Sequence, residues 1–196
     1  MARPRKYDRE TVLEKVMLLF WERGYAGASI SGILSATGLK KGSLYRSFGN
    51  KESLFRLALR RYSARGPQFM GDPAPSLAGL LQIYSRLVDD AAVPDLRSRG
   101  CFLFNSGLEF GAARGGAAGD VRLELGKLED FFRAAIDRAV KDGDLPRGLD
   151  RRAAAARAFS AAFTLRSIAR FRPERAFLKE IANAALASLG TKRRIA

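Results

Sequence analysis

The chain has 196 residues, of which 47% are hydrophobic, so it can bury a sizeable core and is not globally disordered. Its 35 lysines and arginines outnumber its 20 acidic residues, which gives a formal net charge of +15. With no histidine and one cysteine, the composition excludes Ser-His-Asp and Cys-His catalysis, an intrachain disulfide and a multi-cysteine zinc site. We therefore expect neither a metal nor a cofactor.

The positive charge is densest near the N-terminus. Residues 1–66 carry a net charge of +9, whereas the much longer remainder, 67–196, carries +6. Such an excess predicts a polyanionic partner, with nucleic acid first, an anionic membrane surface second and a merely soluble basic protein as the bland alternative. No run approaches the roughly 20 apolar residues of a membrane span, and the N-terminus lacks the apolar segment of a secretory signal. We expect a cytoplasmic protein with no membrane partner.

Apolar residues recur every three or four positions, which is the period of a helix and predicts an all-α fold. The first helix is expected at about 8–23. Asp8 can cap its start, because a carboxylate there accepts a hydrogen bond from an orphan backbone N–H. Gly24 can end the helix in a left-handed conformation that other residues resist.

The next stretch predicts a helix-turn-helix motif. A short helix follows Ser29 or Ser31 and is broken at Gly38, and a second short helix covers about 41–47. Gly49-Asn50 then turns the chain, and Asn50 caps a longer helix at 50–65. Two short helices joined by a three-to-four-residue turn with a glycine are typical of this motif.

A change of composition at Gly66-Pro67 to Pro75 marks a predicted domain boundary. It divides the chain into an N-terminal three-helix domain, 1–66, and a larger helical domain, 67–196, with about nine helices in all. The Gly115–Gly119 patch is expected to be a flexible connection. The helices of the second domain are expected at 76–91, 99–113, 120–142, 151–171 and 174–189.

The second short helix of the motif has one apolar and one polar side. Leu44 and Phe48 are expected to face the core, which leaves the polar residues facing outward. A helix fits the major groove of DNA, and Gly42 allows a close approach of the backbone. Lys51 occupies the first turn of the next helix, where the dipole disfavours a cation, so its position suggests an external anion. The predicted DNA-contacting set is Arg3, Arg5, Ser29, Lys40, Lys41, Gly42, Ser43, Tyr45, Arg46 and Lys51.

Residues 8–62, which contain this motif, resemble the N-terminal domain of the tetracycline-repressor (TetR) family of bacterial transcription regulators. The sequence departs from the family pattern at Ser47, where histidine is common, and at Leu34, where a small residue is common. The resemblance implies a homodimer that binds a palindromic double-stranded DNA operator, with repression as the default and a small-molecule inducer bound in the second domain. The pattern is matched by Gly38, Gly42, Ser43, Leu44, Tyr45, Phe48, Lys51 and Leu54.

The inducer pocket is less sharply defined by the sequence. Phenylalanines with a few polar residues favour an apolar or aromatic ligand, although any one of them could simply fill the core. The candidate pocket residues are Cys101, Phe102, Asn105, Glu109, Phe131, Phe159 and Phe163, with Asn105 or Glu109 as the polar anchor. The resemblance places the dimer interface on the last two helices, with Phe159, Phe163, Phe177, Ile181 and Ala185 as candidates, although the apolar residues of these helices could equally belong to the internal core.

Two questions stay open at this point, the role of Cys101 and the class of the protein. Cys101, near two arginines, is either an electrophile or oxidant sensor or a small buried hydrophobe. The protein as a whole is a ligand-responsive regulator, a constitutive DNA-binding or architectural protein, or an enzyme. An enzyme would have to rely on Asp and Glu for acid–base chemistry, for which Glu109 alone is weak support.

Overall fold

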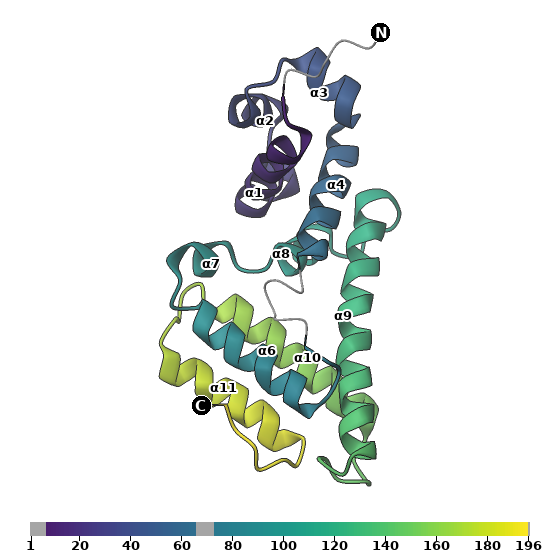
Figure 1. The fold of residues 1–196 in the computed structure, drawn as a ribbon, viewed down its shortest axis with the longest axis vertical. Helices are drawn as coiled ribbons and strands as arrows, with labels where there is room; N and C mark the ends of the chain where they lie inside the picture. The colour runs from purple at the N-terminus through teal and green to yellow at the C-terminus, as the bar shows by residue number, and fades with distance from the viewer. Residues whose placement is uncertain (1–6, 66–72, 196) are drawn as a thin grey trace. The chain divides into compact units, whose positions relative to one another are not determined.

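The computed structural model describes residues 7–65 and 73–195 (Figure 1). Every regular element in these two ranges is an α-helix, which confirms the all-α prediction. By their contacts the described residues form two units. The first contains residues 7–65 and 105–123, and the second contains residues 73–104 and 124–195. The functional division into 1–66 and 67–196 stays a prediction.

The first helix, α1 (Arg9–Gly27), begins as its sequence predicts. The Asp8 carboxylate accepts hydrogen bonds from the backbone N–H groups of Glu10, at 3.2 Å, and Thr11, at 2.9 Å. Gly24 has a φ of 72°, as expected of a glycine at this point, but the helix resumes after this kink and ends at Gly27. The predicted end of the helix is therefore a kink rather than a terminus.

Three more helices follow in the first unit: α2 (Ile30–Thr37), α3 (Lys41–Phe48) and α4 (Lys51–Ala64). Ser29 caps α2, and Gly38 ends it in the left-handed conformation with a φ of 72°. Asn50 caps α4 by accepting a hydrogen bond from the Ser53 N–H at 2.8 Å. The predicted helix-turn-helix arrangement is present, and each short helix begins and ends at a residue whose local chemistry favours that boundary.

Helix α1 packs against α4 and α2 and joins them into a core. Phe20 and Phe55 are fully buried, and their rings meet edge to face at 5.2 Å between centroids. Glu14 of α1 accepts hydrogen bonds from Arg61, at 2.9 Å, and Arg65, at 2.7 Å, on α4. Burial opposes ionisation of Glu14, but these guanidinium groups outweigh it and lower its pKa.

The second unit contains α6 (Leu77–Asp90), α7 (Pro94–Arg99), α10 (Arg151–Ile168) and α11 (Arg175–Ser188). Helices α6, α10 and α11 lie side by side (Figure 1). Helices α8 (Phe102–Phe110) and α9 (Gly116–Lys141) each contain residues of both units.

The helix expected at 99–113 is present as α8, which begins at Phe102 and ends at Phe110. A short helix that the sequence did not predict, α7, precedes it, and Gly100, whose φ is 65°, separates the two. One prediction about this region is wrong. The glycine-rich patch expected to be a flexible connection instead contains the first turn of α9, which begins at Gly116. The Glu52 side chain of α4 accepts a hydrogen bond from the Ala117 N–H in this turn, so a tertiary contact overrides the poor helix propensity of glycine.

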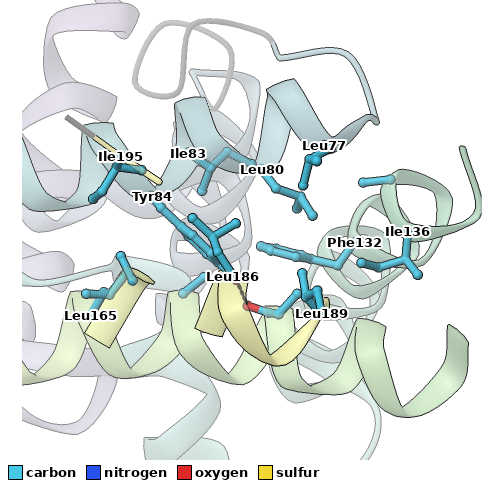
Figure 2. Packing of buried hydrophobic residues seen from close by; sticks show 14 of the residues in the cluster. Leu77, Leu80, Ile83, Tyr84, Phe132, Ile136, Leu165, Leu186, Leu189 and Ile195 are labelled. Carbon is cyan, nitrogen blue, oxygen red and sulfur yellow. Dashed lines mark hydrogen bonds between the residues drawn. The ribbon is translucent and has the colours of Figure 1, made fainter. Parts of the chain in front are cut away.

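The core of the second unit is built from leucines and small residues around one buried tyrosine. Figure 2 shows Tyr84 of α6 among Leu80, Ile83, Leu165 and Leu186. Tyr84 is fully buried, and its hydroxyl donates a hydrogen bond to the Ala158 carbonyl at 2.9 Å. Burial raises the pKa of Tyr84 well above its ordinary value, so the hydroxyl stays protonated and keeps this bond.

Candidate nucleic-acid interface

The start of α3 is open. Lys40, its N-cap residue, supplies no side-chain hydrogen bond to the first turn in the described structure. In the same ranges, apart from its chain neighbours and the backbone of its own helix, no heavy atom lies within 4 Å of the position that a Cβ at Gly42 would occupy. The first N–H groups of a helix without a capping side chain attract anions and acceptors, and a glycine there leaves the backbone accessible. Packing inside the chain does not require this glycine, which fits an approach from outside.

The outer face of α3 gathers four of the predicted contact residues. Lys41, Gly42, Tyr45 and Arg46 are exposed, and they fall on one side because positions four apart lie one turn apart. On the other side Leu44 is 1% exposed and Phe48 is 4% exposed, which fixes the helix to the core. Ser43 is half-buried at the edge of this face.

Two further predicted contacts, Ser29 and Lys51, lie at the starts of α2 and α4, the helices before and after α3 in the chain. The Ser29 hydroxyl accepts a hydrogen bond from the Gly32 N–H at 3.1 Å, so its position at the start of α2 is fixed by its capping role. Lys51 has partners within the chain: its Nζ lies 3.5 Å from the Ala26 carbonyl oxygen and 4.7 Å from the centre of the Tyr25 ring. These contacts offset the unfavourable dipole that suggested an external anion. Arg3 and Arg5 lie outside the described residues.

A contact that the sequence did not reveal joins the start of α1 to the end of α3. The hydroxyls of Tyr7 and Ser47 form a hydrogen bond, and the Arg9 guanidinium lies 5.1 Å from the centre of the Phe48 ring. Ser47 occupies the position where the family commonly has histidine. The partners are 40 residues apart, and no local pattern signals such a pairing.

In the second unit an aromatic cluster contains three of the predicted pocket residues. Phe131 contacts Phe132, Phe132 contacts Phe159, and Phe104 contacts both Phe159 and Phe163, with ring centroids between 4.8 and 5.9 Å apart. We call these five residues the phenylalanine cluster. Phe104 contacts two of the other rings and was not singled out from the sequence, although it stands two residues from Phe102 in an aromatic run.

The other predicted pocket residues are placed differently. Phe102 is 1% exposed and Cys101 is half-buried, both in the second unit. Asn105 and Glu109 belong by their contacts to the first unit. The Glu109 carboxylate accepts hydrogen bonds from two backbone N–H groups of α1, so its acceptor oxygens are already engaged.

A buried ion pair also lies in the second unit and was missed by sequence reasoning. Arg166 of α10 donates to Asp90 of α6 at 3.1 Å, and Arg86 lies 3.1 Å from the other oxygen of Asp90. Burial raises the pKa of Asp90, and the two guanidinium groups oppose that shift. Arginine and aspartate at helical surface spacing look solvated in a sequence, so only the packing shows that this pair is buried.

The predicted dimer residues are half-buried. Phe177, Ile181 and Ala185 follow one stripe of α11 at intervals of four residues, and the Arg172 guanidinium lies 4.1 Å from the centre of the Phe177 ring. Phe159 and Phe163, predicted for both the pocket and the interface, contact the phenylalanine cluster. Within the described ranges no helix is long and apolar enough to cross a membrane.

Two short helices, the second with an open start and a polar outer face, define a helix-turn-helix protein. Residues 13–58 match the family model described as bacterial regulatory proteins, tetR family. The chain is 28% identical to the HTH-type transcriptional repressor ComR of Escherichia coli (strain K12), over 74% of this chain and 71% of that protein.

Solved structures extend the match to nearly the whole chain. A cysteine mutant of the TetR family transcriptional regulator CifR, complexed with 26-bp double-strand operator DNA, is 31% identical with a TM-score of 0.77. The match covers 95% of this chain and 99% of that one. AibR, in complex with isovaleryl coenzyme A and operator DNA, shares the fold at 22% identity with a TM-score of 0.66, over 92% and 96% of the chains. The chain belongs to the TetR family: it is a DNA-binding transcriptional regulator and not an enzyme.

Proposed function

We propose that the chain is a ligand-responsive repressor that binds a palindromic operator as a homodimer and is released by a small-molecule inducer. The observation that carries its DNA-binding part is the geometry of α3. Leu44 and Phe48 anchor the helix, while Lys41, Tyr45 and Arg46 face outward. A helix held in this way can enter the major groove with its N-terminal residues toward the base edges.

The proposed contacts divide into base-reading and phosphate-binding groups. Lys40, Lys41, Gly42 and Ser43 lie at the start of α3, the end that faces the bases in this docking geometry. We assign Tyr45, Arg46, Ser29 and Lys51 to phosphates, which position the protein without reading sequence. A lysine ammonium has three N–H donors, so Lys51 can donate to a phosphate while it also donates to the Ala26 carbonyl. Arg3 and Arg5 complete the proposed set.

The inducer site that we propose is the phenylalanine cluster of the second unit. Five phenylalanine rings on α8, α9 and α10, linked in a chain of four pairwise contacts, offer the apolar lining that small-molecule sites have. This supports an apolar or aromatic inducer. Phe102 and Cys101 precede the cluster along the chain, whereas Asn105 and Glu109 do not enter this proposal because they belong to the first unit.

The proposed dimer interface is the stripe Phe177, Ile181 and Ala185 of α11, together with α10. Ile181→Asp places a charge on this stripe and is expected to give a monomer in sedimentation analysis. Ala187→Asp, at an exposed position of the same helix, is the matched control and is expected to remain a dimer. A wild-type chain that sediments as a monomer at micromolar concentration would contradict the dimer.

The test of the function is selection from random-sequence duplex DNA at near-physiological salt. A sequence-specific dimer recovers one palindromic site. A constitutive architectural protein recovers no motif, and its binding is lost steeply as salt rises. The inducer is then sought by titrating the operator complex with substituted benzenes and with short aliphatic acids, using release of labelled DNA as the readout.

A further inference from the structure

Two carboxylates of the first unit hold backbone N–H groups of other helices. The Glu109 carboxylate of α8 accepts hydrogen bonds from the N–H of Tyr25 at 2.7 Å and the N–H of Ala26 at 2.6 Å. Both donors follow the kink at Gly24, where α1 departs from regular helical geometry. We call this contact the Glu109 clamp.

The second carboxylate accepts from a residue that follows it in the chain, whereas Glu109 accepts from residues that precede it. Glu52 of α4 accepts a hydrogen bond from the Ala117 N–H at 2.9 Å, in the first turn of α9. One turn further along both helices, Arg56 donates to Asp120 at 2.7 and 3.2 Å. We call these four residues the Glu52 clamp. A carboxylate that accepts from the N-terminal turn of a helix stabilises that turn through its dipole and its unpaired N–H groups.

Each clamp is closed against a glycine. A Cβ added at Gly24 would lie 2.7 Å from Oε2 of Glu109, and one added at Gly116 would lie 2.0 Å from Oε1 of Glu52. Both glycines also have positive φ, at 72° and 50°. The close approach of each carboxylate therefore depends on the absence of a side chain at the glycine. A contact between two flexible side chains on the surface does not restrict the backbone in this way.

The clamps join α1 and α4 to the segments of α8 and α9 that belong to the first unit. Helix α1 packs against α4 and α2, and its Arg9 guanidinium lies 5.1 Å from the centre of the Phe48 ring of α3. Helix α8 belongs to the second unit up to Phe104, and α9 belongs to it from Glu124 onward. Ring contacts reinforce the first connection, because Phe110 of α8 lies 5.3 Å from Tyr25 and 5.4 Å from Phe55 between centroids.

We propose that the Glu109 and Glu52 clamps are positioning devices that set the half-site spacing the dimer recognises. The inference rests on the proposed function. A dimer must present its two reading helices about one DNA turn apart, roughly 34–36 Å. With the clamps intact, α1 and α4 are held to the segments of α8 and α9 that belong to the first unit, so the helix-turn-helix motif keeps one orientation on these two helices before DNA is bound. Without them the helix-turn-helix motif swivels, and binding two half-sites at once costs orientational entropy.

Non-specific binding does not depend on that spacing, which makes the proposal testable. Glu109→Gln and Glu52→Gln each remove one negative charge and replace one acceptor oxygen with an NH₂ group that faces a backbone N–H. Glu22→Gln removes the same charge from an exposed position of α1 and is the matched control. Affinity is measured by fluorescence anisotropy for the selected operator, for operators with one or two base pairs inserted between half-sites, and for a scrambled duplex.

Both clamp variants are expected to bind the operator about tenfold more weakly than Glu22→Gln, the size of a lost charge-assisted hydrogen bond. Their preference for the natural spacing over the inserted operators is expected to shrink, while binding to the scrambled duplex stays unchanged. A general loss of stability would not change the spacing preference selectively. Amide hydrogen exchange at Tyr25, Ala26 and Ala117 checks that each clamp has opened.

Wild-type operator affinity and spacing preference in variants whose amides exchange faster would overturn the inference and leave the proposed function intact. A wild-type chain that selects no site at all would overturn both. If a glutamate variant does not fold, Asp120→Asn takes its place, because it breaks only the ion pairs of Asp120 with Arg56 and Arg60, whose side chains are 39% and 65% exposed. An unchanged spacing preference in Asp120→Asn would then overturn the role of the Glu52 clamp.

Discussion

The guanidinium of Arg166 lies 3.1 Å from the carboxylate of Asp90, and both side chains are 10% exposed. Removing one member of a buried pair leaves an uncompensated charge, which costs about 3–5 kcal/mol. We expect Asp90→Asn to lower the free energy of unfolding in urea by about that amount. Asp89→Asn is the adjacent control, because its pair with Arg175 is 53% exposed on each side and contributes at most about 1 kcal/mol. Equal losses in the two variants would contradict the buried role of the pair.

The two partners of this pair are not equivalent. Arg166→Met is expected to cost less than Asp90→Asn, because an aspartate left alone can take up a proton and an arginine cannot lose one. Burial already raises the pKa of Asp90, and loss of Arg166 removes a cation that opposes this shift. Where Asp90 stays ionised, Arg86 still lies 3.1 Å from its carboxylate. The urea unfolding of both variants measures the difference, and a larger loss in Arg166→Met would contradict this reasoning.

Acid should weaken the contact between α1 and α4. The folded-state pKa of Glu14 is lowered from its ordinary value of 4.5, so its stabilising effect is complete above that pH and is lost as pH falls through the lower folded-state value. Glu14→Gln is expected to unfold with about 1 kcal/mol less stability at pH 7 and with a weaker pH dependence below about 4.5. Thermal unfolding between pH 3 and 7 tests this, with Glu22→Gln as control. Parallel pH profiles for wild type and Glu14→Gln would show that the contact is not linked to pH.

Phosphate contacts should weaken binding to all sequences alike. Tyr45, which is 38% exposed, offers a hydroxyl for a phosphate, and we expect Tyr45→Phe to reduce operator and scrambled-duplex affinity by a similar factor, roughly three- to tenfold. Lys51→Met should lower the slope of log K against log salt by about 1. Lys15→Met removes an exposed charge from α1 and is expected to leave that slope unchanged. A loss confined to the operator would instead assign Tyr45 to base reading.

Truncating one ring of the phenylalanine cluster should create a cavity that an apolar ligand can fill. Phe104 is 5% exposed and contacts two other rings of the cluster, so Phe104→Ala is expected to cost about 3–5 kcal/mol. Added benzene should raise the unfolding temperature of this variant, because an apolar cavity stays dry and accepts an apolar ligand. Leu108→Ala, at a position 69% exposed, is expected to change stability by less than about 0.5 kcal/mol. No shift with benzene would mean that the surrounding side chains close the space.

The sequence by itself determined the helices of the first unit and the outer face of α3. Asp8, Gly38 and Asn50 act at helix ends through contacts within four residues, so their roles can be predicted from neighbouring letters. The inward position of Leu44 and Phe48 follows from helical periodicity. The kink at Gly24 and the helix that begins at Gly116 were beyond this reasoning, because a glycine signals conformational freedom but not how the fold uses it.

Only the tertiary structure decided where the charged residues act. Glu109 lies 84 residues from Tyr25, and Arg166 lies 76 residues from Asp90. In the sequence each is an ordinary polar residue of a helix, and nothing local separates a solvated carboxylate from one that holds a backbone N–H group. Hydrogen bonds and ion pairs act over a few ångströms in space whatever the separation along the chain, so their partners appear only once the helices are packed.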